Sequence, residues 1–117
     1  MAYFPGTREH QDTPAATKSP TAFDLGWIVA FLEGEGHFGW KPNGAVFISV
    51  SQVDPEPLLR LLSLAGGRIG VSKRTKTGRP PFHRWQANGA RARGVMMTVY
   101  SFLSLRRRQQ IRRALQG

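Results

Sequence analysis

Cysteine is absent from the 117 residues of this chain. Disulfide bonds and thiolate zinc sites are therefore excluded, and the absence favours a cytosolic compartment without deciding it. No signal peptide or membrane span is evident, because the longest apolar run, Trp27 to Leu32, is far shorter than the roughly 20 residues that a bilayer requires.

Acidic residues are missing from the second half of the chain. All seven acids precede residue 57, and together with four basic residues they give the first 67 residues a net charge of −3. From Arg68 onwards there are thirteen Lys and Arg and no acid, which gives +13. Such a one-sided charge suits a polyanionic partner and opposes self-association without one.

Two different roles for the basic half stay open. A basic face can serve solubility alone, although solvated faces normally mix both signs. An anionic membrane surface fits less well, because the basic residues fall on predicted strands and loops as well as on a helix.

The chain length corresponds to one domain. Residues 1–20 contain three prolines and little periodic hydrophobicity, so we predict a flexible N-terminal arm there and a single domain over 21–117.

One stretch, Gly26 to Gly36, organises the rest. It is apolar for several residues, with Gly26, Ala30 and Gly34 aligned at every fourth position, which predicts a helix that another helix can approach closely. It ends in Glu33 and Glu35, although helix C-termini disfavour negative charge unless a cation compensates it. We expect Glu33 to have a structural role, accepting hydrogen bonds at the helix end.

The remaining periodicities predict an α+β fold with the order αββαββαα and a four-stranded antiparallel sheet. The predicted elements are a helix over 21–35, strands 37–41 and 45–51, a helix over 54–65, strands 68–75 and 82–87, and helices over 92–103 and 105–115. We expect Asp54 to cap the second helix. The residues predicted to be buried in the last three segments include Trp85, Met96, Val99, Phe102, Leu103, Leu105, Ile111 and Leu115, and Trp40 is also predicted to pack in the core.

Alternation in the strands separates two faces of the predicted sheet. Val46, Ile48 and Val50 face the core, whereas Phe47, Ser49 and Ser51 face away from it. The second hairpin places cations and short polar groups outward. A face of this composition can lie along a nucleic-acid groove and contact both phosphates and base edges.

The string from Ile28 to Gly36, IVAFLEGEG, resembles the signature of the LAGLIDADG homing endonucleases, and the element order over about residues 22 to 115 is similar to that family. The resemblance implies a saddle-shaped DNA-binding sheet and, since one signature is present, a homodimer. The implied dimer interface comprises Gly26, Trp27, Ala30, Phe31 and Gly34.

The resemblance also implies a site for DNA cleavage that depends on Mg²⁺ or Mn²⁺. Glu35, with the neighbouring Gly34, falls at the metal-binding position, and Gln52 falls where the family has a polar residue near the metals. Arg106 replaces a basic residue, usually lysine, by the scissile phosphate. Arginine stabilises phosphate charge there but does not accept a proton.

We therefore expect a site-specific, double-strand DNA endonuclease, cytoplasmic and nucleoid-associated or organellar rather than secreted, that is not attached to a membrane. The candidate DNA contacts are His37, Lys41, Ser49, Ser51, Arg68, Ser72, Lys73, Arg74, Lys76, Arg79, Arg84, Gln86 and Arg108. Open alternatives are a non-cleaving protein of the same fold, such as an intron RNA maturase or a DNA-binding regulator, and a basic ribosome-associated or architectural protein. The latter does not account for a helix that ends in two acids.

Overall fold

A computed structural model describes residues 20–72, 78 and 80–116. Its elements follow the chain as α1 (Ala22–Glu35), β1 (His37–Trp40), β2 (Val46–Gln52), α2 (Glu56–Ala65), β3 (Arg68–Val71), β4 (His83–Asn88), α3 (Gly89–Val99), a 3-10 turn (Tyr100–Phe102) and α4 (Leu105–Gln116). The predicted α+β class and element order are confirmed. The arm predicted for residues 1–20 lies, apart from Pro20, outside the described residues.

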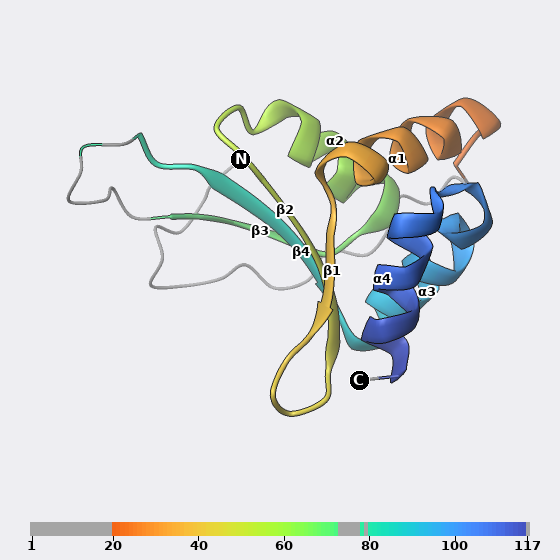
Figure 1. Ribbon diagram of the computed structural model, residues 1–117. Helices are drawn as coiled ribbons and strands as arrows, with labels where there is room; N and C mark the ends of the chain where they lie inside the picture. Colours follow the sequence, from red (N-terminus) through yellow and green to blue (C-terminus); the bar gives the residue numbers. More distant parts are fainter. Residues whose placement is uncertain (1–19, 73–77, 79, 117) are drawn as a thin grey trace.

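The four strands form one antiparallel sheet in the order β1-β2-β4-β3. The helices lie on one side of it (Figure 1). Because successive strand residues point to opposite faces, this arrangement buries every second side chain and leaves the others on a face without helices. We call this second surface the open face.

The core fills the space between the sheet and the helices. Trp85 is fully buried at its centre and donates its indole N–H to the Gly66 carbonyl over 2.8 Å. A buried tryptophan of this kind combines a large apolar surface with a satisfied polar atom. The other fully buried side chains include Leu32, Ile48, Leu58, Leu61, Ile69, Met96 and Ile111.

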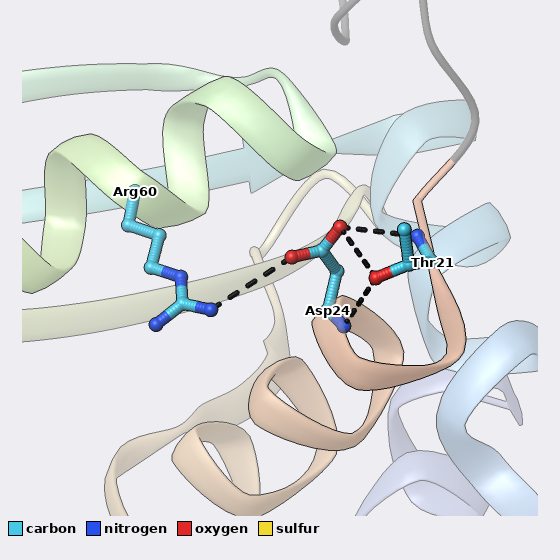
Figure 2. A network of polar contacts seen from close by, with 3 residues as sticks. All are labelled: Thr21, Asp24 and Arg60. Atoms are coloured by element: carbon cyan, nitrogen blue, oxygen red, sulfur yellow. Dashed lines mark hydrogen bonds and ion pairs between the residues drawn. The ribbon is translucent and has the colours of Figure 1, made fainter.

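Helix α1 begins with a reciprocal cap. The Thr21 hydroxyl accepts from the Asp24 backbone N–H, and the Asp24 carboxylate accepts from the Thr21 N–H. Figure 2 shows the same carboxylate facing Arg60, 3.8 Å away on α2. The hydrogen bonds from Thr21 lower the pKa of Asp24, with a smaller contribution from Arg60. The cap therefore fixes where α1 begins.

Several predicted element ends differ from the structure. Asp54 accepts from the Glu56 N–H, but α2 itself starts at Glu56 after Pro55. Helix α3 starts at Gly89 and ends at Val99, where the chain tightens into the 3-10 turn. Strand β3 ends at Val71, and positions 73–75 of the longer predicted strand lie outside the described residues.

Three predicted core residues are exposed. Phe102 is 62% exposed because the 3-10 turn rotates it outward, and Leu105 is 59% exposed because α4 turns Arg107, Ile111 and Ala114 inward instead. Trp40 is 48% exposed at the end of the edge strand β1. For Phe102 and Leu105 the hydrophobic residue was assigned to a helical stripe whose phase the 3-10 turn changes, whereas Trp40 lies on the side of the sheet predicted for it and is exposed by its place at the strand end.

Candidate nucleic-acid interface

A row of polar side chains crosses the whole open face. Strand pairing places His37 opposite Ser49, Ser49 opposite Gln86, and Gln86 opposite Arg68. The four residues come from all four strands, although they lie far apart in the sequence. The structure thus brings four of the predicted DNA contacts into one line.

A second row lies nearer the end of α1. Ser51 pairs with Arg84, and the Arg84 Nε donates to the Ser51 hydroxyl over 3.3 Å. No acid occupies the open-face positions of the four described strands, which carry Arg68 and Arg84 among hydroxyl, amide and imidazole groups. This surface offers positive charge and hydrogen-bonding groups together, as a phosphate backbone and base edges require.

The other predicted DNA contacts that the structure describes lie outside the two rows of the open face. Lys41 lies in the β1–β2 turn, and the Ser72 hydroxyl accepts from the Phe82 N–H where the β3–β4 hairpin opens. Arg108 lies half-buried on α4 and is therefore not a residue of the open face. Lys73, Arg74, Lys76 and Arg79 fall outside the described residues.

The two acids at the end of α1 have different environments. Glu33 accepts two hydrogen bonds from Ser104, one from the backbone N–H at 2.7 Å and one from the hydroxyl at 2.8 Å. Ser104 immediately precedes α4, and its carbonyl accepts from the Arg108 N–H. Glu33 therefore sits at the positive end of the α4 dipole, in agreement with the structural role expected for it.

Arg107 supplies the cation that the end of α1 requires. It is only 8% exposed and donates to the Glu33 carbonyl at 2.9 Å and to the Gly36 carbonyl at 2.6 Å. It also donates to the Gln110 side-chain carbonyl at 2.9 Å. Burial lowers the pKa of Arg107, as does the charge of Arg106, while Glu33 and Glu35 oppose this shift. The ends of α1 and α4 thus satisfy each other's unpaired backbone groups.

The contact between the end of α1 and the start of α4, which we call the junction, depends on the small size of Gly36. A Cβ atom at this position would lie 2.7 Å from the Leu32 carbonyl oxygen, closer than any side chain tolerates. The backbone can therefore turn directly from α1 into β1, which sets Glu35 and His37 on either side of the turn.

We expect the stability of the fold to depend on the charge of Glu33. The hydrogen bond from the Ser104 N–H lowers the pKa of Glu33 below its ordinary value of 4.5, despite the opposing effect of burial. A carboxyl group with a lower pKa in the folded state stabilises fully above its unfolded pKa and loses that contribution as the pH falls through the folded pKa. In urea unfolding, the wild-type advantage over Glu33→Gln should be constant at neutral pH and shrink below about pH 4.5.

The matched control for this measurement is Glu56→Gln, because Glu56 is exposed on α2 and lies outside the junction. The free energy of unfolding of this control variant should depend on pH in the same way as that of the wild type. An advantage over Glu33→Gln that stays the same from neutral to acidic pH would rule out a contribution from the Glu33 charge.

Glu35 takes no part in the hydrogen bonds that join the ends of α1 and α4. It is exposed and makes no hydrogen bond or ion pair with any other described residue. Arg106 is exposed one position before Arg107, and both Glu35 and Arg106 act electrostatically on that buried guanidinium. The structure therefore places these two predicted catalytic residues at the same junction.

Gln52, the third predicted catalytic residue, ends β2. It lies three residues beyond the Ser49–His37 pair, in the direction in which β1 returns to α1. It consequently occupies the same end of the sheet as Glu35. Its alternation matches Val50 rather than Ser51, so its side chain starts from the helix-covered face, where it is half-buried.

The predicted dimer face of α1 is accessible. Gly26, Ala30 and Gly34 are all exposed, and Cβ atoms added at the two glycines would meet nothing within 4 Å among the described residues beyond the adjacent helix backbone. Trp27 and Phe31 stack on each other at 5.0 Å beside this strip and are half-buried.

Two residues outside the predicted interface adjoin the same face. Arg60 covers part of Trp27, with its guanidinium 4.3 Å from the ring centroid. Phe23, which is 76% exposed, extends the apolar surface and was not predicted.

The donor chemistry of Glu35 suits a hard divalent cation, since Mg²⁺ binds carboxylate oxygens and commonly keeps waters and phosphate oxygens as further ligands. Within the described part of the chain no cluster of three His, Cys, Asp or Glu side chains is arranged to hold a metal. Glu35 is thus a single exposed carboxylate and not part of such a cluster among these residues.

Two important residues were missed by sequence reasoning. Arg107 stands within a run of three arginines, and only the spacing to Ile111 and Ala114 distinguishes it as the inward one. Ser104 had a recognisable signal, since serine before an apolar and basic helix is a favoured N-cap residue.

Comparison of the chain with family models, with curated proteins and with solved structures found no match. Among the described residues no helix is long and apolar enough to cross a membrane.

Proposed function

We propose that the protein is a homodimeric, divalent-metal-dependent DNA endonuclease of the LAGLIDADG type, with the open face lying in the major groove. The observation that carries this proposal is the placement of exposed Glu35 at the end of a small-residue helix face, beside an acid-free polar row across the sheet. The resemblance of the Ile28 to Gly36 string to the family signature adds support.

The dimer in this proposal forms by contact of two α1 helices. Exposed Gly26, Ala30 and Gly34 allow the backbones to approach closely, and a two-fold crossing near Gly34 brings the two Glu35 carboxylates together. Two carboxylates at short distance repel, which favours the binding of a divalent cation between them.

Each side chain has a separate role in phosphodiester hydrolysis. Glu35, with the Gly34 backbone, would hold Mg²⁺ or Mn²⁺, which supplies charge neutralisation and a more acidic bound water. Arg106 stabilises negative charge on the phosphate and stays protonated throughout. Gln52 would orient water by hydrogen bonding around the end of β2, because its side chain starts from the helix-covered face. Arg107 holds the ends of α1 and α4 in place, together with Glu33, and does not contact the substrate.

Selection of bound duplexes from a randomised DNA pool tests the function. With Mg²⁺ the protein should cut both strands of the selected duplex, and with a chelator it should bind the same duplex without cutting it. Binding should weaken steeply as salt rises, because cations released from the phosphates drive much of the affinity. Selective binding to a folded RNA, with no cutting of any DNA, would replace the endonuclease proposal with the maturase alternative.

A charge at the centre of the α1 face should weaken dimer formation. For Ala30→Glu we expect the dimer dissociation constant to rise at least about tenfold, because two like charges meet across the two-fold axis. DNA cutting should fall in parallel, while the melting temperature changes little, since Ala30 is exposed. Light scattering with and without the selected duplex measures the first effect.

The control is Ala90→Glu, which adds the same charge at an exposed position of α3. It should leave the dimer intact. A fully dimeric and active Ala30→Glu protein would remove the α1 face from the interface.

A further inference from the structure

The open face contains one apolar side chain among its polar ones. Within the four described strands, Phe47 is the only large hydrophobic residue at an open-face position. It lies in the row next to His37 and Ser49, on the side away from the end of α1. A phenyl ring can neither pair with a phosphate charge nor hydrogen-bond to a base, so the role of Phe47 on this face must be a different one.

The ring of Phe47 is held in a defined position. Gly39 is its partner on β1, and a Cβ atom there would lie 2.9 Å from Phe47 Cζ and 3.0 Å from Cε2. The ring therefore lies across the Gly39 backbone. On one side it contacts the His37 imidazole, with the ring centroids 5.5 Å apart and the planes tilted by 49°. Phe47 is half-buried by these contacts, so its exposed part is a fixed apolar spot.

The major groove offers one apolar group to such a surface, the C5 methyl group of thymine. The other base edges there present hydrogen-bond donors and acceptors, for which a phenyl ring is a poor partner. We propose that Phe47 contacts the C5 methyl group of a thymine and makes the protein selective for thymine at that position. This inference rests on the proposed function, since it requires the open face to lie in the major groove.

The register also places the thymine within the site. Phe47 lies two residues along β2 from Ser49, which corresponds to about 7 Å of strand. This is about two base-pair steps along duplex DNA. Because Glu35 marks the centre of the dimeric site, the contacted thymine lies outside the central base pairs and occurs once in each half-site.

Deoxyuridine provides a direct test, because it differs from thymidine only by the missing methyl group. In the duplex selected by the wild-type protein, each thymine is replaced in turn by deoxyuridine, and the dissociation constant is measured with the chelator present. At one symmetry-related pair of positions the affinity should fall by about fourfold per half-site, the factor that burying one methyl group gives.

Variants then assign the effect to Phe47. Phe47→Ala should bind thymine and deoxyuridine at that position equally. Trp40→Ala removes an exposed aromatic ring that alternates to the other side of the sheet, and it should keep the thymine preference. Gly39→Ala keeps the phenyl ring but displaces it, so the preference should shrink without a loss of thermal stability.

The outcomes separate the inference from the proposed function. Selective binding and cutting with no sensitivity to deoxyuridine at any position would overturn the Phe47 contact and leave the endonuclease intact. The same holds if Phe47→Ala retains the full preference. Failure of the wild-type protein to select any DNA would overturn both. The measurements on the wild type decide the matter even if a variant does not fold.

Discussion

Replacement of Glu35 by glutamine is expected to abolish DNA cutting while DNA binding persists. Glutamine keeps the shape of the side chain but lacks the charge that holds a divalent cation. The loss of roughly 4 kcal/mol of transition-state stabilisation corresponds to a rate at least about a thousandfold lower. Affinity for the selected duplex should stay the same or increase slightly, because a negative charge near the phosphates is removed. Single-turnover cutting in Mg²⁺ and binding in a chelator measure the two effects.

The fold should tolerate this change, since Glu35 is exposed and makes no hydrogen bond or ion pair with another described residue. The melting temperature of the variant should therefore match the wild type. Glu56→Gln removes another exposed carboxylate, on α2, and should cut at the wild-type rate. Equal cutting by Glu35→Gln and Glu56→Gln would eliminate Glu35 as the metal ligand.

Loss of the Arg107 side chain should cause the largest drop in stability. Arg107→Ala leaves the Glu33 and Gly36 carbonyls without their donors and opens a space beneath Phe38, over whose ring the guanidinium lies at 5.8 Å. Buried acceptors without a partner each cost about 1 to 3 kcal/mol. We expect the free energy of unfolding to fall by about 3 kcal/mol, measured by urea denaturation.

Arg113→Ala is the matched control, because Arg113 lies on the same helix but is exposed in its last turn. It should change the free energy of unfolding by less than about 0.5 kcal/mol. Arg107→Lys should recover only part of the loss, since one ammonium group does not reproduce the planar donors of the guanidinium. If Arg107→Ala and Arg113→Ala were equally stable, the junction between α1 and α4 would not depend on this side chain.

Periodicity predicted the element order and the two faces of the sheet. Strand alternation alone separates Ser49 and Ser51 from the core positions Val46, Ile48 and Val50, because neighbouring strand residues must point to opposite faces. Periodicity failed where a short turn shifts the phase of the next helix, so that Phe102 and Leu105 were wrongly assigned to the core.

The sequence by itself determined that Glu33 and Glu35 end a helix lined with small residues, and that the chain after Arg68 carries no acid. These are local properties, set by residue type and spacing. Only the tertiary structure decided that Ser104 engages Glu33, that Arg107 is the buried member of its run, and that one row joins all four strands across the open face. The physical reason is that strand order and helix packing join residues as far apart as Glu33 and Ser104, 71 positions in sequence, and no local pattern specifies such contacts.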